Sequence, residues 1–191
     1  MNENTTNYKK LNRTMSLQLA NVLSLIFFIP VIAIPGLLYR WIWDDTRAFD
    51  GLVWVWDHIF IALAIAVVLI VAHEMIHGLT WRLVSGADKD AVEFGIQWKT
   101  ITPYAHVNAP MKVRDYRLGT IMPGMLTGLL PLIIGLAIGN PVVLVFGMYM
   151  TAAAGGDLLI LWLLRKDPAD ALVEDHPDLA GCYLLVPTKE E

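Results

Sequence analysis

The chain has little cysteine and little charge. Its 191 residues include a single cysteine, Cys182, which excludes an internal disulfide and any metal site built from paired thiolates. Charged residues make up 17% of the chain, whereas soluble domains average about 25%. The net charge is −4 and the basic residues are scattered, so no nucleic-acid-binding surface is predicted. With 56% hydrophobic residues and a mean hydropathy of +0.53, the composition predicts an integral membrane protein.

The chain contains several long apolar segments. A helix needs roughly 20 residues to cross a hydrocarbon core about 30 Å thick, and four segments are long enough. The first is longer than the apolar region of a signal peptide and lacks a small-residue cleavage site, so we expect it to be retained. Gly139-Asn140-Pro141 is a turn signal that predicts a helical hairpin between the last two. The predicted transmembrane helices are 17–39, 59–84, 118–139 and 142–164.

The basic residues predict how these helices are oriented. Cytoplasmic loops of membrane proteins carry an excess of Lys and Arg. The segment before residue 17, the 85–117 loop and the start of the 165–191 tail are rich in them, whereas the 40–58 loop is mainly acidic and the turn at Asn140 has none. We therefore expect both termini and the 85–117 loop on the cytoplasmic side of the membrane.

The 85–117 loop also contains an alternating apolar pattern. Val92, Phe94, Ile96 and Trp98 alternate with polar or small residues, which predicts a strand. A second strand would complete a hairpin over 91–107. The predicted fold is an all-α polytopic membrane protein of four transmembrane helices, with a small cytosolic-side β-hairpin between the second and third. Residues 1–191 form one membrane-embedded domain with a polar cytosolic tail, and the loops are too short for a PDZ or CBS domain.

Three polar residues interrupt the second apolar segment. His73-Glu74-Met75-Ile76-His77 fits the pattern H-E-x-x-H. Histidines at positions i and i+4 share one helix face and can bind one metal ion, with the glutamate beside them as general base. Zinc lowers the pKa of a bound water to about 7 and so supplies a nucleophile. Because such residues are costly in lipid, their position inside an apolar helix strengthens the prediction of a Zn²⁺ site.

A catalytic zinc site needs a third protein ligand, and the best candidate is Asp157. The predicted topology runs the second and fourth helices in the same direction. His73 and His77 would lie about 10–16 Å from the cytosolic end of their helix, and Asp157 about 10 Å from the end of its own. Gly155 and Gly156 would let the partner helix approach.

The other histidines are weaker candidates. His106 lies in the predicted hairpin. We expect it to be a surface or structural residue, and the alternative is a contact to a metal ligand or to substrate. His176 is predicted to be a structural turn residue, and His58 lies at the opposite end of the second helix from the site. Five histidines are too few for the di-iron boxes of membrane desaturases.

Several motifs together resemble a known bacterial family. "HEMIHG", "PMKVRDYRLGTIMPG", "AAAGGDLLILWLLRK" and "DHPDLAG" look like the bacterial membrane zincin peptidases, a domain of unknown function, over roughly residues 55–187. That family is similar to the site-2 proteases. The resemblance implies a bacterial cell membrane, zinc held by His73, His77 and Asp157, Glu74 as base, and membrane-protein or peptide substrates. Gly155-Gly156-Asp157 departs from the N-P-D-G-like stretch of many site-2 proteases, which makes Asp157 the less secure ligand.

These observations predict a zinc-dependent intramembrane endopeptidase. Two alternatives stay open at this point: a membrane protein that binds zinc for a structural or regulatory purpose, and a transporter or scaffold without metal. A structural zinc site has four protein ligands and needs no general base such as Glu74. The presence of Glu74 therefore favours the peptidase. The physiological substrate and the oligomeric state are left open by the sequence.

Overall fold

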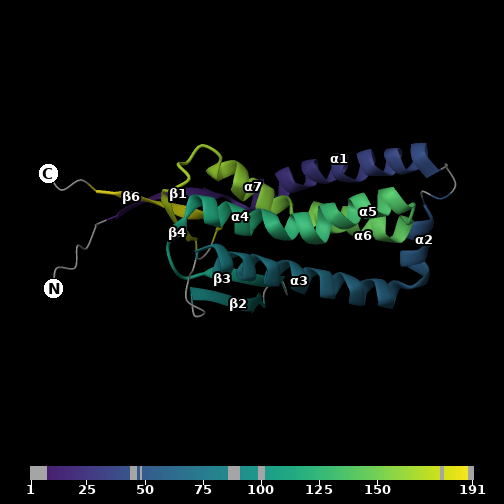
Figure 1. Cartoon of the computed structure of the whole chain (residues 1–191), viewed down its shortest axis with the longest axis horizontal. Helices are drawn as coiled ribbons and strands as arrows, with labels where there is room; N and C mark the ends of the chain where they lie inside the picture. Colours follow the sequence, from purple (N-terminus) through teal and green to yellow (C-terminus); the bar gives the residue numbers. More distant parts are fainter. Residues whose placement is uncertain are drawn as a thin grey trace.

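The computed structural model describes residues 8–43, 47, 49–85, 91–98, 102–176 and 179–188. It is mostly helical, and its long helices run side by side along one axis (Figure 1). A β-sheet lies at one end of the helices, next to both chain termini, and the short helix α2 (Asp50–Asp57) lies at the other end. The arrangement is therefore a helical body with a small sheet at one end.

Three helical segments of the described chain are long and apolar enough to cross a membrane. They are α1 (Leu17–Trp43), from Val22 onward, α3 (Ile59–Ser85), and a continuous helical segment over Val113–Ile138. The last consists of α4 (Val113–Pro123), the π-helix η3 (Gly124–Leu129) and α5 (Leu130–Ile138). It begins five residues earlier than the predicted 118–139 helix, and these added residues, Val113–Arg117, are mostly polar.

The predicted fourth helix is broken. Pro141–Ala153 forms α6 and Gly155–Leu164 forms α7, with a bend of 41° between them. The pair counts as a fourth membrane crossing only if both pieces belong to one span. The break lies at Ala154, whose ψ of 6° departs from helical geometry just before two glycines. The segment predicted as the 142–164 span thus consists of two helices, and a fourth membrane crossing stays a prediction.

The turn between α5 and α6 forms as the sequence predicts. Gly139 adopts a left-handed conformation (φ 66°), which ends α5 at little steric cost. The Asn140 side chain accepts hydrogen bonds from the amides of Val142 and Val143, and Pro141 occupies the first helical position. Gly128 of η3 lies against the backbone of Thr151, where a Cβ atom would be only 2.7 Å from the amide nitrogen. The two helical segments therefore pack closely.

The expectation of an all-α protein with polar ends is wrong. A four-stranded antiparallel sheet has the order β1-β6-β5-β4, from Tyr8–Met15, Ala180–Pro187, Leu172–Asp175 and Met111–Lys112. The chain before the first helix thus pairs with the tail after the last one. The tail forms strands because Val173, Cys182 and Leu184 are apolar and pack against Trp81 and Val113 in one core cluster.

The predicted hairpin is formed by β2 (Val92–Gln97) and β3 (Thr102–Val107), which pair antiparallel. It does not project beyond α3 but runs back along it (Figure 1). Val92 shares a core cluster with Trp81, and the Phe94 ring lies against Gly78, where a Cβ atom would collide with it. Gly78 therefore lets the hairpin reach the part of α3 that carries the predicted site.

Candidate metal centre

Helix α3 brings His73, Glu74 and His77 together as the i, i+4 spacing predicts. The two imidazole rings are 4.9 Å apart and nearly perpendicular, and both histidines are buried. Ligand atoms of all three residues lie within 4.8 Å of one another, so the group could hold a metal ion. These side chains face the protein interior, which explains how an apolar helix tolerates them.

Asp157 reaches the same place from α7. Its Oδ2 atom lies 3.0 Å from His73 Nε2, and its Oδ1 atom lies 3.4 Å from His77 Nε2. The bend at Ala154 puts Asp157 in the first turn of α7. Gly155 lies against Ser24 and Phe27 of α1, and a Cβ atom at Gly156 would meet no described atom within 4 Å. The two glycines therefore do not make room for α3, contrary to the sequence argument.

Both histidine rings are held by their other nitrogen. His77 Nδ1 lies 2.9 Å from the carbonyl oxygen of Gly119 and donates its proton there. His73 Nδ1 lies 3.3 Å from Thr127 Oγ1, and that hydroxyl donates in turn to the Pro123 carbonyl oxygen. Thr127 lies in η3, a kind of helix that is often found at functional sites. With both Nδ1 atoms acting as donors, both Nε2 lone pairs face the Asp157 carboxylate.

This donor set fits a zinc ion. The Nε2 atoms of two imidazole rings converge on one carboxylate, and two imidazole nitrogens with one carboxylate oxygen form a common catalytic zinc site. Ligands of a tetrahedral zinc ion lie about 3.3 Å from each other, given metal–ligand bonds of about 2.0–2.1 Å. The observed nitrogen–oxygen separations of 3.0 and 3.4 Å are close to that value. His73, His77 and Asp157 are therefore able to hold the metal together.

Glu74 is oriented by the hairpin. Its Oε2 atom accepts a hydrogen bond from the Ala105 amide of β3, at 3.0 Å. The Asn108 amide, just after β3, donates to the Ala91 carbonyl oxygen, just before β2. Along an antiparallel strand, successive amides point alternately toward the partner strand and away from it. The Ala105 and Val107 amides therefore point away from β2 and toward the site. Sequence reasoning missed this role, because an alanine amide leaves no signal in a residue pattern.

Two cavities meet at Asp157. One, of about 210 Å³, is polar, and its lining includes Glu74, His77 and Asp157 together with Tyr116, His106 and Asp175. The second, of about 230 Å³, is almost wholly apolar, with Phe27, Met125, Ala154 and Leu158 in its lining. The site therefore borders both a wettable space and an apolar space.

The remaining histidines lie apart from the metal-binding group. His106 Nδ1 is 3.3 Å from Asp175 Oδ2, and both residues line the polar cavity. His176 bonds the Leu179 amide and the Tyr183 hydroxyl. His58 stacks on Trp54 at the end of α2.

Asp175 and Tyr116 are the residues of this region that sequence reasoning did not single out. The Tyr116 hydroxyl donates to Asp175 Oδ1 at 2.5 Å, and burial raises the pKa of the Asp175 carboxyl above its ordinary value. The signal that could have found Asp175 is the pair of carboxylates, Glu174 and Asp175, that follows the apolar pair Leu172-Val173 in a short strand.

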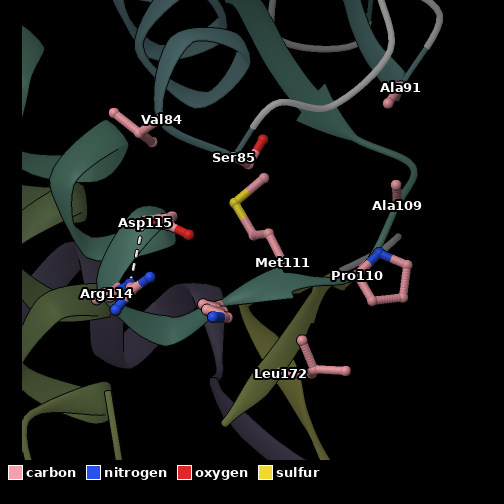
Figure 2. Close-up of a pocket in the computed structure, with 10 residues that line it drawn as sticks. Val84, Ser85, Ala91, Ala109, Pro110, Met111, Arg114, Asp115 and Leu172 are labelled. Atoms are coloured by element: carbon pink, nitrogen blue, oxygen red, sulfur yellow. Dashed lines mark ion pairs between the residues drawn. The ribbon is translucent and has the colours of Figure 1, made fainter. Parts of the chain in front are cut away.

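A further cavity, of about 560 Å³, lies between the end of α3, β4 and the start of α4 (Figure 2). Val84, Ser85, Met111 and Leu172 line it, together with charged residues of α4. Arg114 pairs there with Asp115 at 3.5 Å and also with Asp170 at 3.3 Å. Because its lining holds none of the predicted metal ligands, this cavity is separate from the metal centre.

Comparisons with known proteins agree with this chemistry. A family model described as "Putative zincin peptidase" matches residues 66–172, more than half of the chain. A protein of Pyrococcus woesei, described as "Uncharacterized 24.7 kDa protein in gap 5'region", is 28% identical over 113 residues, or 58% of this chain and 49% of that protein. The chain thus spans about half the length of this curated relative. No solved structure matches it. The matched residues include His73, Glu74, His77 and Asp157, and the chain belongs to this zincin peptidase family.

Proposed function

We propose that the protein is a zinc-dependent intramembrane endopeptidase of the site-2-protease type. One observation carries the proposal: the Nε2 atoms of His73 and His77 converge on Asp157, and Glu74 and Asp157 line one polar cavity. A structural zinc site would be closed by four protein ligands and would have no adjacent cavity.

In this proposal His73, His77 and Asp157 hold the metal. A bound zinc ion lowers the pKa of a water to about 7 and polarises a carbonyl group. The other catalytic step belongs to Glu74. Its Oε2 atom is fixed by the Ala105 amide, so its Oε1 atom would take the proton of the attacking water and pass it to the leaving amine.

The substrate we propose is an apolar segment of a membrane protein or peptide. The apolar cavity at Asp157 would accept a large apolar side chain next to the cleaved bond. The site-facing amides of Ala105 and Val107 already bind Glu74 and Asp175, and residue 103 is a proline, which has no amide hydrogen. A peptide added along β3 would therefore be held through the carbonyl groups of this edge.

We further propose a bacterial cell membrane location with both termini cytoplasmic. The helices provide the apolar surface, and the Lys and Arg excess before residue 17, in 85–117 and after 164 supports the orientation. Reporter fusions at each terminus test it, and an active periplasmic reporter at either one would overturn the orientation.

The function is tested with three purified variants in detergent micelles. Glu74→Gln should keep the bound zinc and lose cleavage of a quenched-fluorescence library of apolar peptides by about 10²–10⁴-fold, since general base catalysis contributes that much. His77→Ala should lose both zinc and cleavage, and His58→Ala should lose neither. Equal cleavage by Glu74→Gln would overturn the mechanism. Zinc-loaded wild-type protein that neither cleaves the library nor binds a peptide hydroxamate would favour the non-proteolytic zinc protein.

A further inference from the structure

Asp175 lines the same polar cavity as Glu74, His77 and Asp157. Both of its carboxylate oxygens are occupied: Oδ1 by the Tyr116 hydroxyl at 2.5 Å, and Oδ2 by the Val107 amide at 3.0 Å and His106 Nδ1 at 3.3 Å. The Asp175 side chain is only 10% exposed. These contacts come from α4 and β3, so two separate elements fix this one carboxylate of β5.

All three groups around Asp175 can act as donors. Asp175 Oδ2 and His106 Nδ1 are in contact, so the buried pair can hold one proton between these two atoms. With that proton held between Oδ2 and Nδ1, the other ring proton of His106 lies on Nε2. Asp175 thus sets both the orientation of His106 and the nitrogen that carries its proton.

The other nitrogen of His106 is available to the cavity. Across the residues that the structure describes, no hydrogen bond is made by His106 Nε2. The His106 side chain is 28% exposed and lines the same cavity as Glu74, His77 and Asp157. A ring held at Nδ1 and reachable by solvent at Nε2 can offer one directed hydrogen bond to a molecule in the cavity.

We propose that His106 is a catalytic residue whose Nε2–H donates a hydrogen bond to the carbonyl oxygen of the peptide bond that is cleaved, and that Asp175 is its positioning residue. The inference rests on the proposed peptidase function. As water adds to the carbonyl carbon, negative charge develops on that oxygen, and a preoriented donor stabilises the charge. His106 itself keeps its covalent bonds and its protons throughout.

Two near-isosteric variants separate this role from a structural one. In His106→Asn the side-chain amide can replace Nδ1 and keep the contact to Asp175, but it reaches no further. In His106→Gln the amide can replace Nε2 and keep a donor in the cavity. A purely structural His106 would make the Asn variant the better enzyme, whereas a catalytic His106 makes the Gln variant the better one.

The measurements are kcat and KM for a peptide that the wild-type protein cleaves, with zinc content and thermal unfolding of each variant. We expect kcat to fall about 100-fold in His106→Asn and His106→Ala, in line with the loss of one such donor. We expect His106→Gln to stay within about 10-fold of wild type, with little change in KM or zinc for any variant. Affinity for a phosphinic peptide, whose oxygens imitate the charged state, should follow kcat.

The inference is overturned if His106→Asn cleaves and binds the phosphinic peptide like wild type, or if His106→Gln is the weaker of the two. Failure of the proposed function would look different. In that case the wild-type protein itself would not cleave peptides, whatever residue stood at position 106.

Discussion

The helical body and the four-stranded sheet expose different kinds of side chain. In the helices, Phe60 is 85% exposed and Val68 is 66% exposed, while His73, His77 and Thr127 are buried. In the sheet, Val173 and Cys182 are completely buried, and the exposed Lys10 pairs with Glu174. The helices thus have the pattern expected in lipid, and the sheet has the pattern of a domain in water.

The metal centre lies where these two regions meet, and each contributes a different part of it. The helices supply His73, His77 and Asp157, the groups that could hold a metal. The hairpin amide of Ala105 orients Glu74, and the sheet supplies Asp175. The sheet is therefore part of the site and more than an end cap of the helices.

The largest expected effect concerns Cys182 in the middle of the sheet. Burial raises the pKa of its thiol to about 12, so at pH 8 the folded protein should hold about 1,000-fold less thiolate than an unfolded chain. Iodoacetamide should then react at least that much more slowly with the folded protein in micelles than after denaturation. As the chain has one cysteine, the measurement needs no background mutation.

The control uses the same strand. Val186 is 37% exposed on β6, so Val186→Cys in a Cys182→Ser background should react nearly as fast as the denatured chain. Equal reactivity of Cys182 and of this control would mean that the sheet opens freely, and the contrast between the two regions would disappear.

A second prediction compares one substitution in the two regions. Val173→Ala removes two methyl groups from the sheet core and should lower the free energy of unfolding by about 1–3 kcal/mol. Val68→Ala removes the same groups from the exposed surface of α3 and should cost less than about 0.5 kcal/mol. Denaturant titration in micelles measures both. An equal cost at the two positions would show that Val68 contacts protein and not lipid or detergent.

A feature of this molecule could be predicted when the residues that form it lie close together in the sequence. The histidine pair on α3 and the Gly139-Asn140-Pro141 turn are local, because both depend on residues within one helical turn or one loop. Placing Asp157 near the histidines needed the added assumption of matching depth in two spans, and the structure puts it there.

The sheet could not be predicted in the same way. Strand β1 pairs with β6 from the opposite end of the chain, and no local periodicity records such a pairing. The polar residues around Val173 and Cys182 made the tail look like a loop, although Val173, Cys182 and Leu184 are buried. The bend at Ala154 was also hidden, because an apolar segment interrupted by two glycines reads as one helix until packing is known.

The smallest expected effect concerns two ion pairs of the sheet. Arg13 donates from Nε and Nη2 to the two oxygens of Asp167, both at 2.8 Å, and the Asp167 side chain is only 7% exposed. Lys10 meets Glu174 at 2.9 Å, with side chains that are 49% and 32% exposed. Arg13→Lys keeps the charge but loses the two-pronged geometry, so we expect a cost of about 1 kcal/mol in the free energy of unfolding.

The matched change, Lys10→Arg, should alter stability by less than about 0.3 kcal/mol, because exposed pairs contribute little in either form. Added salt should weaken the exposed Lys10–Glu174 pair by screening its charges and leave the buried Arg13–Asp167 pair nearly unaffected. Arg13 joins the strand before α1 to the segment after α7, so its loss should also raise the reactivity of Cys182. A Lys10 variant that destabilised the protein as much as the Arg13 variant would mean that the sheet is held by its surface charges and not by its buried contacts.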